Sequence, residues 1–208
     1  MENRHKPYAL LIGLLAAFTI IAQYTLNVID ATEPQAHIFF RYWGYFTILT
    51  NSMVAGHMLL SALAPQRYPK LTSAAATTCL AGFITVVALV YYLLLVQTNE
   101  TEGFRKVLDL NFHTFIPLLT VLYWFIFTPK ANLKWGMVGR WILIPFGYFI
   151  YIMVLGEIIG KYPYPFFNVN EHGYTSVLIM AIGLLAFLAV MCLLYIGLGK
   201  LMSRKKSA

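Results

Sequence analysis

The sequence has few charged residues and very few cysteines. Only 11% of its 208 residues are charged, whereas soluble globular domains carry about 25%. Hydrophobic residues make up 60% of the chain and the mean hydropathy is +0.70, so the composition excludes a soluble domain and indicates a membrane protein. The two cysteines, Cys79 and Cys192, each lie inside an apolar run, which excludes a disulfide framework and favours a packing role.

Motifs for metals, thiol chemistry and phosphates are absent as well. The sequence contains no H-E-x-x-H, no paired C-x-x-C and no glycine-rich phosphate loop, so no spacing predicts a metal site or a bound cofactor. The net charge is +7, but the basic residues form short clusters between apolar runs, where they act as topology signals. We therefore expect no metal, no cofactor and no nucleic-acid partner.

Six apolar runs are each long enough to cross the bilayer core of about 30 Å at about 1.5 Å per residue. They cover about 7–29, 39–63, 71–96, 109–128, 138–160 and 173–199. The first run has no A-x-A-like cleavage site close behind it, so it predicts an uncleaved span and not a signal peptide. The predicted fold is all-α: a single domain, 1–208, that forms an integral membrane bundle of six transmembrane helices.

The basic residues predict the orientation of the six spans. Eleven of the fifteen lysines and arginines lie near the chain ends or the connections 64–70 and 129–137, which all fall on one side of the bundle. The four on the opposite side are Arg41, Arg105, Lys106 and Lys161. Cytoplasmic loops carry the excess of basic residues, so we expect both termini in the cytoplasm. The expected location is the plasma membrane of a bacterium.

The second predicted span carries more hydroxyl and amide groups than contact with lipid requires. At about 100° per residue, one face of a continuous helix carries Trp43, Gly44, Thr47, Thr50, Asn51, Val54 and Met58. Polar groups at membrane depth are costly and usually face the interior of a bundle. This polar stripe therefore predicts a site that begins at Thr47.

The fourth predicted span places a histidine, His113, at the same outer depth as Thr47. A neutral histidine can take a proton from a hydroxyl, and a threonine needs such a base to become a nucleophile. The pair is therefore a candidate for nucleophilic catalysis if the two side chains meet. A simpler interpretation also fits the spacing, because the hydroxyl of Thr47 can bond back to its own helix.

Three neighbouring polar residues admit two interpretations each. Asp109 lies four residues before His113 on the same helical face, so it can orient the ring or cap the start of the helix. Thr50 and Asn51 can donate hydrogen bonds to a developing oxyanion, or they can bond to other helices. The sequence leaves these alternatives open.

The segment 162–167, with the sequence YPYPFF, follows the fifth span on the outer side. Its two prolines and its aromatic residues favour an extended segment at the membrane interface over a helix. Such a segment is well placed to cover a site near the outer leaflet, which makes Tyr164 and Pro165 candidate pocket residues.

Three stretches together resemble a known family: Phe46-Thr47 in the second span, His113-Thr114 with Pro117 in the fourth, and Tyr164-Pro165-Phe166 after the fifth. They resemble the androgen-induced-gene family of multi-span membrane hydrolases, and in particular its small six-span bacterial relatives. The resemblance implies cleavage of fatty acid esters of hydroxy fatty acids inside the membrane. It also implies that Thr47 is the nucleophile and His113 its base.

Two functions are consistent with these patterns. The first is a lipid-ester hydrolase whose pocket opens toward the outer leaflet and binds a membrane lipid or acyl ester. Its expected pocket residues are Trp43, Thr50, Asn51, Asp109, Tyr164 and Pro165. The second is a small transporter or lipid-binding protein that uses the same polar cavity, with His113 as a proton site. No pair of broken helices is expected from the sequence, which favours the hydrolase.

Overall fold

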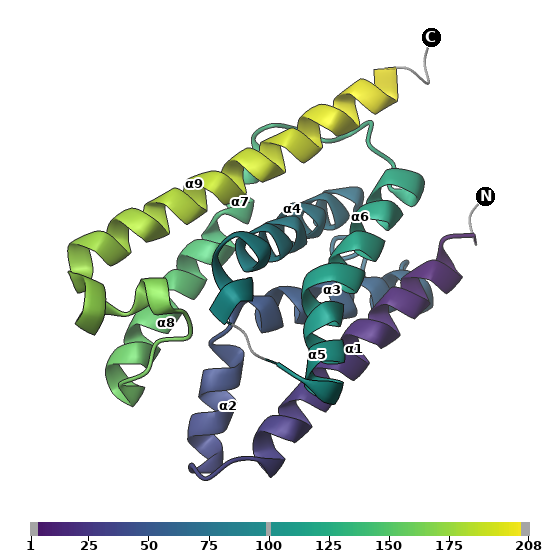
Figure 1. Ribbon diagram of the computed structural model, residues 1–208. Helices are drawn as coiled ribbons and strands as arrows, with labels where there is room; N and C mark the ends of the chain where they lie inside the picture. The colour runs from purple at the N-terminus through teal and green to yellow at the C-terminus, as the bar shows by residue number, and fades with distance from the viewer. Residues whose placement is uncertain (1–3, 99–100, 205–208) are drawn as a thin grey trace.

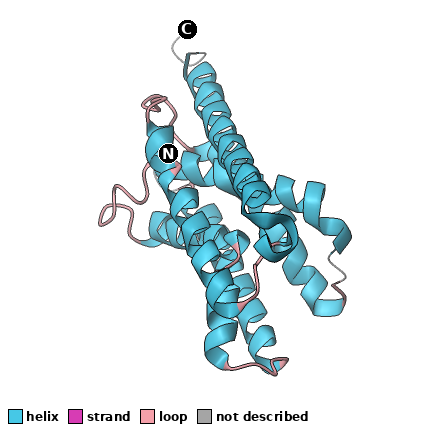
Figure 2. Cartoon of the chain, turned by 90° about the vertical axis from the view of Figure 1, so that its left-hand side faces the viewer, coloured by secondary structure: helices cyan, strands magenta, loops and turns pink. Residues whose placement is uncertain are grey.

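The structure is a computed structural model that describes residues 4–98 and 101–204. Within these residues helix is the only regular structure, as Figure 2 shows. Six helical stretches are long and apolar enough to cross a membrane: Lys6–Ile29, Phe46–Leu63, Ala74–Leu95, Gly103–Phe127, Met137–Ile159 and Val169–Arg204. The chain is therefore a multi-pass, all-α membrane protein, which confirms the predicted class.

The helices follow one another along the chain with short connections. The α-helices are α1 (Lys6–Ile29), α2 (Gln35–Trp43), α3 (Phe46–Leu63), α4 (Ala74–Val90), α5 (Gly103–Leu110), α6 (Ile116–Phe127), α7 (Met137–Trp141), α8 (Leu143–Ile159) and α9 (Val169–Arg204). Two π-helical segments, η1 (Tyr91–Leu95) and η3 (Asn111–Phe115), extend α4 and join α5 to α6, and the 3₁₀ turns are η2 (Val96–Thr98) and η4 (Pro165–Phe167).

Helix α4 lies at the centre of the bundle and packs against α3, α6 and α9 (Figure 1). Its residues 77–84 are all buried. Helix α1 packs along α3 on one side, and α9 covers the other side (Figure 1). Glycines permit two of these close approaches, because a Cβ at Gly13 would lie 2.8 Å from Leu59 Cγ and a Cβ at Gly82 would lie 2.9 Å from Cys192 Sγ.

The second apolar run is not one continuous helix, which corrects the prediction. Helix α2 ends at Trp43, Tyr45 has an extended backbone (φ −86°, ψ 126°), and α3 starts at Phe46. Trp43 therefore does not share a helical face with Thr47. The part of the predicted stripe that lies within α3 does face the interior, since Thr50, Asn51, Val54 and Met58 are all 0% exposed.

Tyrosines of α8 stabilise the break between α2 and α3. A helix end leaves backbone carbonyls without a partner, and at membrane depth water is not there to satisfy them. Tyr148 Oη donates to the carbonyl of Gly44 at 2.7 Å, and Tyr151 Oη donates to the carbonyl of Phe40 at 3.2 Å. The side chain of Tyr45, at the start of α3, makes no capping hydrogen bond.

The fourth apolar run becomes helical earlier than predicted, and this start decides whether Asp109 can cap the helix. The helical stretch begins at Gly103, with Glu102 at its N-cap position. Asp109 therefore lies inside the helix, where it cannot cap the helix start. The interpretation of Asp109 as a helix cap is wrong.

Both ends of the described chain lie on the right-hand side of Figure 1, away from the α1–α2 and α8–α9 connections. Near those connections Glu33 pairs with Arg41 at 3.0 Å and with Lys161 at 2.7 Å. A third basic residue, Arg105, pairs with Asp30. Three of the four basic residues predicted to lie outside thus have an acidic partner.

We expect both termini to be cytoplasmic, because of the distribution of basic residues. The test uses single cysteines at two exposed asparagines, Asn132 between α6 and α7 and Asn170 near the start of α9. A membrane-impermeant thiol reagent applied to intact cells should label Asn170→Cys and spare Asn132→Cys. The native Cys79 and Cys192 are buried, which keeps the background low. The reverse labelling pattern would show that the orientation is wrong.

We also expect Gly82→Ala to destabilise the contact between α4 and α9. The added Cβ needs space that Cys192 Sγ occupies, and overpacking costs about 1–3 kcal/mol. The matched control is Gly183→Ala in α9, where nothing lies within 4 Å of an added Cβ. Thermal unfolding in detergent should show a lower midpoint for Gly82→Ala and an equal or higher midpoint for Gly183→Ala. Equal midpoints for the two variants would contradict the close packing.

Candidate active site

The side-chain hydroxyl of Thr47 has a different kind of hydrogen-bond partner from several other hydroxyl groups of the spans. Thr19, Thr25, Ser52, Thr78 and Thr85 each donate to the carbonyl four residues earlier in their own helix. Thr47 is the second residue of α3, so the residue four positions earlier belongs to a different helix. Its Oγ1 lies instead 3.4 Å from His113 Nε2. The interpretation that Thr47 bonds back to its own helix is therefore wrong.

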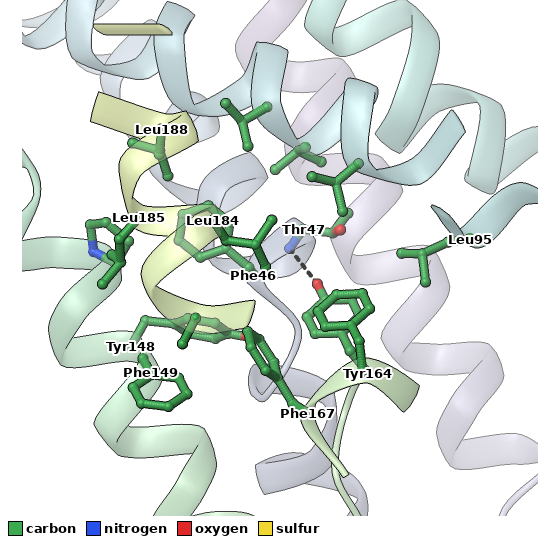
Figure 3. Close-up of a pocket in the computed structure, with 16 residues that line it drawn as sticks. Phe46, Thr47, Leu95, Tyr148, Phe149, Tyr164, Phe167, Leu184, Leu185 and Leu188 are labelled. Carbon is green, nitrogen blue, oxygen red and sulfur yellow. Dashed lines mark hydrogen bonds between the residues drawn. The ribbon is translucent and has the colours of Figure 1, made fainter. Parts of the chain in front are cut away.

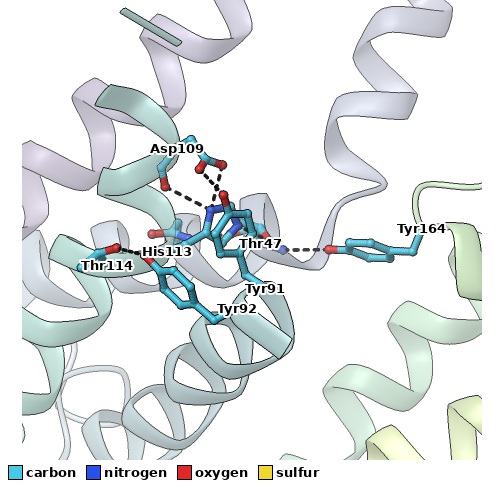
Figure 4. A network of polar contacts seen from close by, with 8 residues as sticks. Thr47, Tyr91, Tyr92, Asp109, His113, Thr114 and Tyr164 are labelled. Carbon is cyan, nitrogen blue, oxygen red and sulfur yellow. Dashed lines mark hydrogen bonds and ion pairs between the residues drawn. The ribbon is translucent and has the colours of Figure 1, made fainter. Parts of the chain in front are cut away.

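His113 is oriented by two oxygen atoms of Asp109 (Figure 4). Its Nδ1 lies 3.0 Å from the Asp109 carbonyl oxygen and 3.1 Å from the carboxylate Oδ1. Both oxygens accept hydrogen bonds, so the tautomer that satisfies them carries its hydrogen on Nδ1. The lone pair of Nε2 then faces the hydroxyl of Thr47, which is the arrangement that a general base requires.

Tyr91 completes this network and is not among the site residues predicted from the sequence. Its ring stacks on the His113 ring with a centroid distance of 3.8 Å and an interplanar angle of 9°. Its hydroxyl donates to Asp109 Oδ2 at 2.5 Å. Tyr91 lies near the C-terminal end of the third apolar run, close to the connection that leads to His113. That shared depth was the available sequence signal.

The histidine and the tyrosine both lie in π-helical segments. His113 is in η3 and Tyr91 is in η1, at the ends of helices that lie next to each other. A second contact joins the same two segments, because Tyr92 Oη lies 2.5 Å from Thr114 Oγ1. Single π turns in α-helices are rare and frequent at functional sites. The two π-helical segments therefore support a functional role for this site.

An apolar cavity lies on one side of Thr47 (Figure 3). It holds about 630 Å³ of empty space, its open mouth included. Aliphatic and aromatic side chains of α4, α8, η4 and α9 provide most of its wall, among them Val87, Phe149, Phe167, Leu184 and Leu188. A cavity with this lining suits a hydrocarbon chain.

A second cavity lies on the other side of Thr47 and holds about 1090 Å³ of empty space, its open mouth included. We call it the polar cavity because polar and charged side chains form part of its wall. His113, Asp109 and Tyr91 line this cavity and do not line the apolar one. Arg105 also lines it, and its guanidinium contacts Asn27 Oδ1 at 3.1 Å. The residues that line both cavities are Thr47, Leu95 and Tyr164. Thr47 thus lies at the boundary between the apolar and the polar cavity.

The remaining predicted pocket residues take different positions. Pro165 lines the polar cavity. Thr50 and Asn51 line neither cavity, so the structure does not bring them to the place of a developing oxyanion, and Asn51 Nδ2 instead donates to the carbonyl of Thr47 at 2.8 Å. Trp43 also lines neither cavity, and its ring packs against Phe39 and its neighbour Tyr42.

Tyr164 of the YPYPFF segment lies against Thr47. Its backbone is extended, and the following residues, Pro165–Phe167, form a 3₁₀ turn instead of continuing the extended segment. Tyr164 Oη accepts a hydrogen bond from the backbone N–H of Thr47 at 3.4 Å (Figure 3). Burial raises the pKa of Tyr164 above its ordinary value, and hydrogen bonds with Thr47 offset part of the rise. Its hydroxyl is therefore neutral at physiological pH.

Charged groups near the α1–α2 and α8–α9 connections face a third, polar cavity, which holds about 1270 Å³ of empty space, its open mouth included. This cavity shares Asn27, Tyr42, Tyr45 and Arg105 with the polar cavity beside Thr47. Glu33 lies on its wall, and the hydrogen bond from Lys161, together with the charge of Arg41, lowers the pKa of this carboxylate. The shared residues thus place polar and charged side chains next to the polar cavity beside Thr47.

Comparisons with models of protein families, with curated proteins and with solved structures found no match for this chain. The resemblance to the androgen-induced-gene family, drawn from short motifs around Thr47, His113 and Tyr164, therefore stays a prediction. The chemistry of the site rests on the geometry of these side chains.

The contact between residue 47 and His113 can be tested without any substrate. We expect Thr47→Cys to react quickly with methyl methanethiosulfonate, because a neighbouring histidine increases the thiolate fraction of a cysteine. Adding His113→Ala should slow this reaction by about tenfold or more. The control is Thr101→Cys, which lies in the same polar cavity and should react at the same rate with or without His113. Equal rates for Thr47→Cys in both backgrounds would contradict the contact.

Proposed function

We propose that this protein is an intramembrane hydrolase of lipid esters, with Thr47 as nucleophile, His113 as general base and acid, and Asp109 as the residue that positions His113. The observation that supports the proposal is the chain of contacts from Thr47 Oγ1 through His113 to Asp109. Its threonine lines both an apolar and a polar cavity, whereas His113 and Asp109 line the polar cavity. A hydroxyl, a base and an orienting carboxylate are the three parts of a hydrolytic triad.

The first half of the reaction transfers the acyl group to Thr47. Thr47 Oγ1 bonds to the ester carbonyl carbon while its proton passes to His113 Nε2, and the electron pair of the C=O π bond moves to the carbonyl oxygen. When that oxyanion collapses, the bond to the alcohol oxygen breaks and Nε2 gives its proton to the departing alkoxide. Asp109 stabilises the imidazolium between these two transfers.

The second half releases the acyl group. A water molecule gives one proton to His113 Nε2 as its oxygen bonds to the acyl carbon. Collapse of the second oxyanion breaks the bond to Thr47 Oγ1, which recovers its proton from Nε2. The products are a fatty acid, an alcohol and the original enzyme, and no cofactor is needed.

The two cavities suggest how the substrate lies. His113 must reach the departing alcohol oxygen, and it lines the polar cavity but not the apolar cavity. The alcohol portion therefore lies in the polar cavity, and the acyl chain lies in the apolar cavity between α4, α8 and α9. A lipid ester, with one apolar and one polar part, has the form that this division requires.

The substrate class is a fatty acid ester. The motifs around Thr47, His113 and Tyr164 resemble those of hydrolases that cleave fatty acid esters of hydroxy fatty acids, which supports this choice. We further propose that the protein resides in the plasma membrane of a bacterium, with the site toward the outer leaflet. The small six-span members that the motifs resemble are bacterial.

The alternative function is that of a small transporter or lipid-binding protein, and one observation favours it. The second apolar run is broken between α2 and α3 beside Thr47, and broken helices line the binding sites of many transporters. A transporter or binding protein needs no hydroxyl aligned with a base, however. Release of fatty acid by purified protein, without any gradient, distinguishes the two functions.

Four variants test the proposed roles of Thr47 and His113. Thr47→Val keeps the shape and removes the oxygen, so ester hydrolysis should fall by about 10³-fold or more, and His113→Ala should have a similar effect. Thr47→Ser should keep part of the activity, because it retains the nucleophilic oxygen. The double variant should be about as inactive as either single variant, since the two residues act as a unit. Hydrolysis is measured as fatty acid released from a panel of ester lipids.

The matched control is Thr25→Val. Thr25 is exposed on α1 and bonds back to the carbonyl of Ile21, so this variant should keep full activity. Hydrolysis by Thr47→Val at the rate of the unmodified protein, or losses that multiply in the double variant, would remove the proposed mechanism and favour the lipid-binding or transport function.

A further inference from the structure

The backbone amide of Thr47 points to the hydroxyl of Tyr164 (Figure 4). Amides in the first turn of a helix have no acceptor within that helix, and Thr47 is in the first turn of α3. Tyr164 Oη serves as the acceptor at 3.4 Å, which is long for such a bond. In this contact the hydroxyl oxygen accepts, so the contact does not use the hydrogen of the hydroxyl.

Tyr164 is firmly held although it lies in a connection between helices. Its neighbours are Pro163 and Pro165, whose rings restrict the backbone on both sides. Its ring stacks on Phe166 at 5.2 Å with an interplanar angle of 4° and meets the ring of Tyr45 edge-on at 5.7 Å. Only 8% of the residue is exposed. The hydroxyl therefore keeps one position before a substrate arrives, as preorganised stabilisation requires.

We propose that the Tyr164 hydroxyl and the Thr47 backbone N–H together form the oxyanion site of this enzyme. The inference rests on the proposed ester hydrolysis. As Thr47 Oγ1 bonds to the carbonyl carbon, the carbonyl oxygen becomes negative and receives one hydrogen bond from each donor. The Thr47 N–H turns from Tyr164 Oη to the substrate oxygen, and Tyr164 donates the hydrogen that it does not use in this contact.

The position of these two donors matches the position of the reacting carbonyl. Thr47 and Tyr164 both line the apolar and the polar cavity, so an ester that spans the boundary brings its carbonyl between them. The amide belongs to the nucleophile itself, which keeps it close to the bond that forms. The start of α3 also carries the positive end of the helix dipole, which favours a negative oxygen there.

The hydroxyl of another tyrosine that lines the apolar cavity already has a hydrogen-bond acceptor. Tyr148 lines that cavity with Tyr164, but its hydroxyl donates to the carbonyl of Gly44 at 2.7 Å. Releasing it would leave that carbonyl without this partner at the break between α2 and α3. Thr50 and Asn51, the donors suggested by sequence, line neither cavity.

The test compares Tyr164→Phe with a matched control, Tyr195→Phe. Loss of one oxyanion donor typically lowers kcat by about 10²–10³-fold, so we expect such a loss for Tyr164→Phe with KM changed by less than about threefold. Tyr195 Oη bonds to Thr85 Oγ1 at 2.8 Å, and neither residue lines the cavities described above. Tyr195→Phe should therefore keep its kcat within about twofold of the unmodified protein. The probe is a medium-chain p-nitrophenyl ester in detergent.

A second measurement separates an oxyanion donor from a structural residue. The same ester is prepared with sulfur in place of the carbonyl oxygen, because sulfur accepts hydrogen bonds weakly. The unmodified enzyme should strongly prefer the oxygen ester, and Tyr164→Phe should reduce this preference by about tenfold or more. A variant that is merely less well folded loses activity toward both esters equally and keeps the preference.

The outcomes separate the two proposals. If Thr47→Val is inactive but Tyr164→Phe keeps its kcat, or loses activity equally toward both esters, the oxyanion role is overturned and the hydrolase proposal stands. If the unmodified protein hydrolyses no ester, both proposals are overturned. A reduced preference together with a reduced kcat supports the oxyanion site.

Discussion

Backbone polar groups at membrane depth need partners within the protein, and the break between α2 and α3 satisfies this constraint with side chains from other helices. The hydroxyls of Tyr148 and Tyr151 in α8 donate hydrogen bonds to carbonyls at the end of α2. On the other side of the break, the amide of Thr47 meets Tyr164. The break thus places a threonine in the first turn of a helix, where its hydroxyl is not used by its own helix and can face His113.

In the polar network around His113, one ring nitrogen is held by a carboxylate and the other is directed at a hydroxyl. Asp109 and Tyr91 engage Nδ1 and the ring face, while the contact of Nε2 is the hydroxyl of Thr47. Polar groups without partners are expensive in a membrane, and these contacts give both ring nitrogens of His113 a partner. A histidine with one ring nitrogen held and the other directed at a hydroxyl is suited to proton transfer.

The division into two cavities connects this geometry with the lipid environment. Leu184 and Leu188 of α9 and Phe149 of α8 surround the apolar side, whereas Arg105 and Asp109 border the polar side. An amphiphilic ester crosses the same boundary between hydrocarbon and water in a bilayer. The protein thus offers its substrate a similar gradient of polarity, with Thr47 at the boundary.

The sequence by itself determined the six apolar runs, their all-helical class and the shared depth of Thr47 and His113, because hydropathy and helical period are local properties. It did not determine the break at Tyr45, which depends on hydrogen bonds from α8, about a hundred residues away along the chain. Nor did it decide the role of Asp109, because a position inside or at the start of a helix depends on where that helix begins. The contacts of Tyr91 and Tyr164 likewise depend on tertiary packing, because the local sequence around an aromatic residue does not predict which distant residue its side chain will contact.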